Sequence, residues 1–252
     1  MVGSLIERLS DPYDLKARLY PALLCLLPAT ITVLMTVPLA QTALGALVTI
    51  GVSCGGLVLF ADMARGWGKA KQEALFAEWG GEPSTVLLRH RDNRLNPILK
   101  IRYYNFLARK IAENIPAAQE EVANTKRADD IYAAGTTWLR KNTGDTAKVT
   151  LLFKENVTYG CRRNLYGVKR IRIGITVVAI VVTLYRAGVM KWSTVPSISQ
   201  EQGMALASCV AWLAFWIFAV TRNWVKAAAF TYGRALLETC DQFNDDSGKL
   251  AT

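Results

Sequence analysis

The sequence predicts an all-α membrane protein in which four transmembrane helices form two hairpins that flank a helical cytosolic domain. Apolar blocks cover residues 19–39, 43–61, 173–190 and 204–221, and Arg186 is the one charged residue inside them. The chain is 52% hydrophobic with a mean hydropathy of +0.19, which is more apolar than an ordinary globular domain. Between the second and third blocks the apolar residues follow helical spacing, without the long alternation typical of strands.

The apolar blocks divide the chain into five predicted regions. These are a cytosolic N-terminal segment 1–18, a transmembrane hairpin 19–61, a helical cytosolic domain 62–172, a second transmembrane hairpin 173–221 and a cytosolic C-terminal tail 222–252. A helix needs about 20 apolar residues to cross ~30 Å of hydrocarbon, and each block is about this long. The composition excludes a wholly soluble enzyme, a disordered chain and a disulfide-rich secreted domain.

The distribution of charge predicts the orientation. The chain has 30 Lys and Arg residues against 20 Asp and Glu residues, a formal net charge of +10. Basic residues are concentrated between residues 63 and 170, whereas the loop 40–42 between the first two blocks contains none. Because basic residues favour the cytoplasmic side, we expect a multi-pass inner-membrane protein with both termini in the cytoplasm.

Motifs for catalysis or cofactor binding are missing from the sequence. The five cysteines form no Cys-x-x-Cys pair, and one histidine without nearby cysteine or carboxylate partners is not a metal site. Phosphate-binding loops, dinucleotide fingerprints, zinc-protease motifs and serine-hydrolase elbows do not occur. We therefore expect no cofactor, no metal and no enzymatic activity.

A first basic cluster in the central domain is a candidate anion-binding or partner-binding site. Its members are Arg89, His90, Arg91 and Arg94, followed on a predicted helix by Lys100, Arg102 and Arg109. Guanidinium groups bind phosphate through paired donors, so a nucleotide, a nucleic acid or an anionic protein would suit this cluster. The alternatives are a solvated loop paired to local acidic residues and a helix whose interleaved aromatic residues belong to the core.

A second basic cluster precedes the third apolar block. It consists of Arg162, Arg163, Lys169, Arg170 and Arg172. Basic residues next to a membrane span are attracted to anionic lipid headgroups, which predicts lipid anchoring here. Trp192 and Trp224 stand where an interfacial aromatic belt is expected.

The apolar blocks contain two further candidate features. Gly51, Gly55 and Gly56 provide the small surface that lets helices pack closely, either within the chain or in a homo-oligomer. Arg186 lies near the outer end of the third block, where it snorkels to the interface or takes part in a pore or an interhelical contact. Just after the second block, Gly66 and Gly68 are a candidate hinge or a passive break.

Several helix boundaries are predicted in the central domain. The second apolar helix continues to Trp79 and ends at the glycine pair 80–81, after which a short helix opens with Ser84 as its cap. A helix over 97–113 begins with Asn96 as cap and a proline at the first helical position. Further helical segments follow residue 116, cover residues 128–139, and lead from about residue 146 into the third block.

The layout of two hairpins around one cytosolic helical module resembles bacterial membrane effectors, including those of antiphage defence, in which a cytosolic sensor controls a pore or disrupts the bilayer. The resemblance implies an effector of this type. The close-packing glycines and the small size of a four-span bundle predict a homo-oligomer, and the basic clusters predict an anionic signal or partner. The alternative is a membrane scaffold that tethers a cytosolic partner. A proton-coupled transporter is disfavoured because the apolar blocks contain no acidic residue, histidine or lysine.

Overall fold

The computed structural model describes residues 17, 19–146, 148–189 and 198–249. Within these residues the fold is all helical and contains no strand, which confirms the all-α prediction. The elements are α3 (Tyr20–Thr36), η2 (Pro38–Gln41), α4 (Ala43–Glu78), α5 (Pro83–Leu88), α6 (Pro97–Ile111), α7 (Ala118–Ala123), α8 (Thr125–Asn142), α9 (Thr150–Arg186), α10 (Gln200–Ala214), the π-helix η3 (Phe215–Ala219) and α11 (Arg222–Lys249).

The chain forms two units. Unit 1 comprises residues 1–72 and 160–225, and unit 2 comprises residues 73–159 and 226–252. Three helices, α4, α9 and α11, contribute residues to both units.

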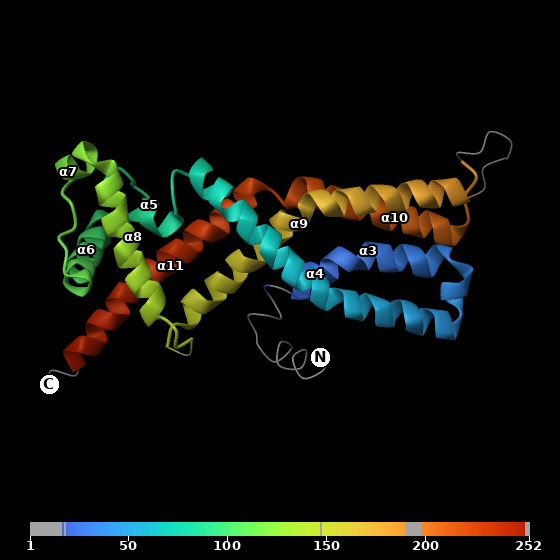
Figure 1. Cartoon of the computed structure of the whole chain (residues 1–252), viewed down its shortest axis with the longest axis horizontal. Coiled ribbons are helices and arrows are strands. Elements are labelled where there is room, and N and C mark those ends of the chain that lie inside the picture. Colours follow the sequence, from blue (N-terminus) through green and yellow to red (C-terminus); the bar gives the residue numbers. More distant parts are fainter. Residues whose placement is uncertain (1–16, 18, 147, 190–197, 250–252) are drawn as a thin grey trace. The chain divides into compact units, whose positions relative to one another are not determined.

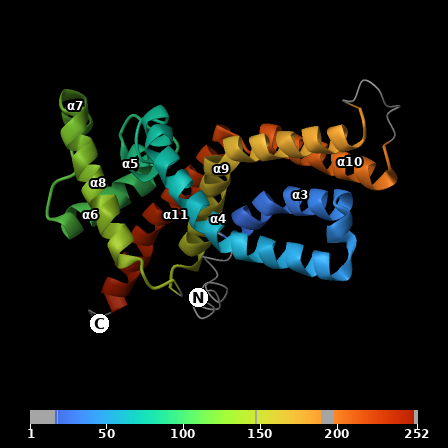
Figure 2. The same cartoon turned by 45° about the vertical axis from the view of Figure 1, so that its right-hand side comes forward.

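Unit 1 contains the four predicted membrane segments. In both views, η2, the C-terminal end of α9 and the N-terminal end of α10 lie at the same end of this unit (Figures 1 and 2). Among the described residues, one helical stretch, Gln200–Ala219, is long and apolar enough to cross a bilayer, and Ala43–Val52 is a shorter apolar helix. The structure thus supports one candidate span where the sequence predicts four.

The interior of unit 1 combines large buried side chains, such as Trp216 and Leu165, with small ones. Ala22, Ala61 and Ala64 are buried, and the Thr32 hydroxyl lies 3.4 Å from the Cys209 sulfur where α3 packs on α10. Small residues let helix backbones approach closely, which is how helices associate without a hydrophobic driving force.

Unit 2 is built by α5–α8 and α11 around an apolar core. Its largest buried members are Leu87, Leu88, Tyr103, Phe106, Leu107, Tyr132, Leu139, Leu236 and Leu237. The predicted start of α6 is confirmed, because the Asn96 side chain accepts a hydrogen bond of 2.8 Å from the Ile98 backbone N–H. The predicted Ser84 cap is wrong: Glu82 occupies the N-cap position, and the Ser84 hydroxyl donates to its carboxylate instead.

The segment after residue 221, predicted as a cytosolic tail, is the 28-residue helix α11. Leu236, Leu237 and Cys240 of this helix are buried in the core of unit 2. Gly233 lies against α5, since a Cβ at this position would stand 3.0 Å from the Ser84 backbone nitrogen. The segment is therefore part of the folded unit.

Candidate functional site

Arg89 of the first basic cluster is an internal structural residue. Its side chain makes a bidentate pair with Asp129, with both N···O distances 2.8 Å, and the residue is 7% exposed. The guanidinium packs against the turn that ends α4, where Gly80 and Gly81 have φ values of +86° and +140°. A Cβ at Gly81 would lie 3.1 Å from the guanidinium, so the glycine pair serves both the turn and the arginine.

His90 is held on three sides. Its backbone N–H donates to Glu121 Oε2 at 2.8 Å, its ring nitrogen Nε2 lies 2.9 Å from the Pro116 carbonyl oxygen, and its ring packs against Tyr104. Tyr132 donates to the same buried Glu121 oxygen at 2.8 Å, and burial raises the pKa of this phenol well above its usual range. Glu121 thus joins the loop after α5 to α8.

Lys100 closes this network from α6. Its buried ammonium donates to the backbone carbonyls of Arg89 at 2.8 Å and Asp92 at 2.6 Å. Arg94 forms an ion pair with Asp92 at 2.5 Å, and its guanidinium stacks 3.9 Å from the centre of the Phe230 ring. Arg91 is different: its side chain is 59% exposed, and its nearest ionic contact, with Glu121, is 3.9 Å long.

Arg102 and Arg109 lie apart from this network, on the side of α6 that meets α11. Arg102 pairs with Asp241 at 2.5 Å, and Arg109 donates to the Asn244 side-chain oxygen at 3.1 Å. A cavity of about 220 Å³ lies between these side chains and Asn105. The seven residues of the predicted site therefore divide into a loop network and a separate seam between helices.

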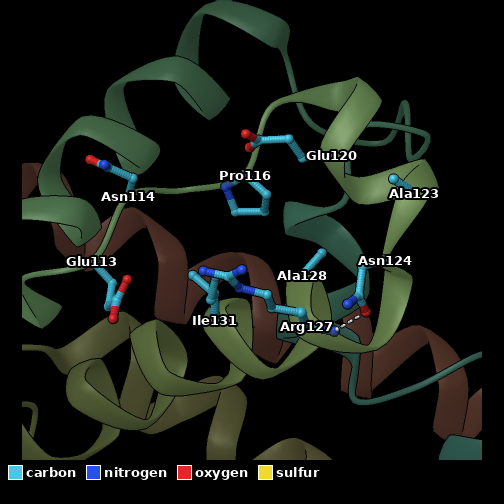
Figure 3. Close-up of a pocket in the computed structure, with 9 residues that line it drawn as sticks. All are labelled: Glu113, Asn114, Pro116, Glu120, Ala123, Asn124, Arg127, Ala128 and Ile131. Carbon is cyan, nitrogen blue, oxygen red and sulfur yellow. Dashed lines mark hydrogen bonds between the residues drawn. The ribbon is translucent and has the colours of Figure 1, made fainter.

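Figure 3 shows a pocket that the sequence did not predict. One of its lining residues, Pro116, is also the residue whose carbonyl oxygen lies next to the His90 ring. The pocket has a volume of about 360 Å³ and is lined by residues from the end of α6 to the first part of α8, with Pro116 and Ala128 among them. The charged side chains Glu113 and Arg127 line it without an ion pair to any residue that the structure describes. Their polar neighbours had no recognisable motif spacing, so no sequence signal pointed to this pocket.

The second basic cluster contacts the junction between α10 and α11. Arg162 donates to the Trp224 carbonyl at 3.0 Å and stacks on its ring, and Arg222 donates to the Tyr166 hydroxyl at 3.1 Å. Lys169 donates to the carbonyl oxygens of Ile217 at 3.2 Å and Val220 at 2.8 Å. Residues 162, 166 and 169 share one face of α9, so they form a ladder along residues 224 to 217, which run in the opposite direction.

The other members of this cluster differ in burial. Arg170 is exposed, whereas Arg163 is 8% and Arg172 0% exposed. Arg163 donates to Gln72 Oε1 at 2.7 Å. Arg163 and Arg172 lie nine positions apart, on opposite sides of α9, and both side chains are buried within the protein. Contact of the five basic residues with lipid headgroups stays a prediction.

The described glycines of α4 differ in their surroundings. A Cβ at Gly56 would lie 3.8 Å from Leu26 of α3, whereas a Cβ at Gly51 would have no described neighbour within 4 Å. The surroundings of Gly55 and the position of Trp192 lie outside the described residues. Arg186 is exposed as the last residue of α9, as expected for a side chain that snorkels.

In the described part of the chain, no three His, Cys, Asp or Glu residues are grouped to hold a metal ion. No family model matches the sequence, no curated protein is significantly similar to it, and no solved structure is significantly similar to its fold.

Proposed function

We propose that this chain is a bacterial inner-membrane effector of the antiphage type, with unit 1 in the bilayer as four spans and both termini in the cytoplasm. Unit 2 is its cytosolic sensor for an anionic signal or partner. Binding in unit 2 controls permeabilisation of the membrane by unit 1.

One observation carries this proposal: the large apolar side chains on the surface are concentrated in unit 1. Of the described large hydrophobic residues that are exposed, unit 2 holds Ile98, Ile101, Val122 and Leu151, and unit 1 holds all the others. Such a surface is costly in water and favourable in lipid.

Helix α9 illustrates the same distribution. Its exposed face carries Val178 and Val182, which are 61% and 46% exposed, whereas Thr176 and Thr183 on the other face are 0% exposed. Both threonine hydroxyls donate to carbonyls of the preceding turn, which removes the cost of burying them. Apolar side chains outside and small polar side chains inside are typical of helices that pack within a membrane.

Aromatic residues supply a boundary for the membrane segment. Tyr20 of α3, Trp67 of α4, Tyr166 of α9 and Trp224 of α11 each lie where the apolar part of a helical segment ends. Trp and Tyr favour the bilayer interface, and the basic residues beyond them favour the cytoplasmic side.

The homo-oligomer is supported by the open surface at Gly51. Because no other described side chain fills the space over this glycine, a neighbouring protomer has access to it. Four spans enclose little space, so a continuous water path requires several protomers.

Liposomes containing the purified protein and a self-quenching dye provide the direct test. We expect dye release after addition of the signal, and in cells a loss of membrane potential on induced expression. Arg91→Gln with Arg94→Gln should reduce the response, with Lys141→Gln and Lys148→Gln as a charge-matched control on exposed residues. A protein that inserts but never releases dye under any tested trigger counts against the effector.

The alternative is a membrane scaffold, favoured by the exposed Ile98 and Val122 on unit 2, which are 70% and 84% exposed. Exposed aliphatic side chains on a cytosolic unit suit a protein partner. A scaffold inserts without depolarising cells, and replacing both residues by Ser abolishes co-purification of its partner.

A further inference from the structure

We propose that the junction between α10 and α11 is a binding site for the phosphodiester headgroup of an anionic phospholipid, such as phosphatidylglycerol. The site, here called the basic junction, consists of Arg162, Lys169, Arg170 and Arg222. This inference rests on the proposed membrane location of unit 1 and goes beyond it by naming the lipid class and the residues that select it.

Three members of the basic junction, Arg162, Lys169 and Arg170, retain hydrogen-bond donors that no described residue accepts. Arg162 donates from Nη1, so its Nε and Nη2 have no partner among the described residues. Lys169 uses two of its three ammonium hydrogens. The exposed guanidinium of Arg170 makes no hydrogen bond with any residue that the structure describes. Forked guanidinium donors match the geometry of phosphate oxygens.

The charge of the site is suited to an anion. Arg162, Lys169 and Arg170 form no ion pair with a carboxylate in the described part of the chain. Unit 1 has two described acidic residues: Asp62 of α4, and Glu201 at the N-terminal end of α10, far along the helix from the junction. The unbalanced positive charge therefore attracts anionic headgroups, each cation near such a surface contributing about 1 kcal/mol.

The surroundings select a lipid over a free phosphate or a nucleic acid. Ile171 and Phe218 are 41% and 77% exposed next to the cationic groups. Tyr166 and Trp224, which contact Arg222 and Arg162, are residue types that favour the headgroup level. A phospholipid carries an anionic phosphate next to apolar acyl chains. Its phosphate therefore suits the cationic groups, and its acyl chains suit the exposed Ile171 and Phe218.

Binding at this place has a structural consequence. The π-helix η3 ends at Ala219, and Val220 with Thr221 separates it from α11. Lys169 already stabilises this break by donating to the carbonyls of Ile217 and Val220. A bound headgroup holds Arg162 and Arg222 on α9 and α11 together, so the lipid stabilises the junction against unfolding.

The experiment uses the full chain in phosphatidylcholine nanodiscs, with phosphatidylglycerol of the same acyl chains as the probe. We expect phosphatidylglycerol to raise the unfolding temperature and to remain bound in native mass spectrometry. Arg162→Gln with Arg170→Gln should weaken this binding by roughly tenfold, while Lys69→Gln with Lys71→Gln, an equal charge change on exposed residues of α4, leaves it within about twofold.

Three results would overturn the site: unchanged binding in the Arg162/Arg170 variant, an equal loss in the Lys69/Lys71 variant, or the same stabilisation by soluble glycerol phosphate. If the double variant does not fold, Arg170→Gln alone decides, because this side chain is exposed and supports no described contact. The proposed membrane location has a separate test. Extraction of the chain from membranes by alkaline carbonate would contradict that location, whatever the result for the lipid site.

Discussion

Gly167 of α9 lies against Gly68 of α4 so closely that a Cβ at Gly167 would stand 2.5 Å from the Gly68 backbone nitrogen. The two helices therefore cross with their backbones in contact. Next to this crossing the buried Asn164 side chain donates to the Ala17 carbonyl at 2.8 Å. A Cβ at Gly68 would lie 2.5 Å from the Asn164 side-chain oxygen. Gly68 is a packing residue inside the continuous helix α4. The predicted break of the helix at Gly66 and Gly68 is therefore wrong, and a hinge motion there stays a prediction.

Gly167→Ala should destabilise unit 1 by about 3 kcal/mol or prevent its folding, because the added methyl group meets backbone atoms that cannot move independently. Gly66→Ala is the matched control. A Cβ at Gly66 has no described neighbour within 4 Å, so alanine should stabilise the helix by up to about 1 kcal/mol. Thermal unfolding in detergent measures both changes, and equal effects of the two variants would contradict the close crossing.

Asp129→Asn should destabilise unit 2 by about 2–3 kcal/mol, because it leaves the Arg89 guanidinium, whose side chain is 9% exposed, without its bidentate partner. The exposed pair of Arg102 and Asp241 provides a control of the same chemistry. These side chains are 56% and 34% exposed, so Asp241→Asn should cost less than about 1 kcal/mol. Urea unfolding followed by tryptophan fluorescence gives both free energies of unfolding. A larger loss of stability in the Asp241→Asn variant than in the Asp129→Asn variant would contradict the structural role of Arg89.

The cap at Asn96 and the end of α4 before Gly80 could be predicted from the sequence, because a cap, a proline at the first helical position and a glycine pair act over a few residues. The role of Arg89 could not, since its partner Asp129 lies 40 positions away. The sequence places Arg89 and Asp129 in the same predicted domain, but it contains no signal that their side chains are in contact.

The apolar helices of unit 1 show the same contrast between local and long-range signals. Apolar runs indicate where a helix suits lipid, but they do not show which face of it meets another helix. The close crossing at Gly68 and Gly167 joins residues about 100 positions apart and has no local spacing signal, unlike the Gly51 and Gly55 pattern that the sequence favoured. Arg163 and Arg172 were grouped with Arg170 by proximity along the chain, although on a helix they face other directions.

Alkaline pH should unfold unit 2. Burial, helped by the nearby charge of Asp241, raises the pKa of Tyr103 and of Cys240 to about 12, from ordinary values of 10.0 and 9.0. Between about pH 9 and 12 the unfolded chain loses these protons while the folded unit keeps them, so the free energy of unfolding falls as pH rises.

Absorbance at 295 nm should therefore show buried tyrosines ionising together with the loss of near-ultraviolet circular dichroism. Tyr103→Phe should move the unfolding midpoint to higher pH, with its stability at pH 7 measured separately as the control. An unchanged alkaline midpoint in a variant that is as stable as the parent at pH 7 would exclude Tyr103 as a source of the pH dependence.

The orientation of the chain can be decided by labelling single cysteines in a variant whose five native cysteines are replaced by alanine. Thr146 in unit 2 and Ser199 at the start of α10 are both exposed, so cysteines at either place are reachable from the side that they face. With unit 2 in the cytoplasm, as the concentration of basic residues predicts, an impermeant maleimide should label the Ser199→Cys protein in intact cells and the Thr146→Cys protein only after lysis. Labelling of Thr146→Cys but not of Ser199→Cys in intact cells would reverse the orientation, and labelling of both alike would argue against a bilayer between them.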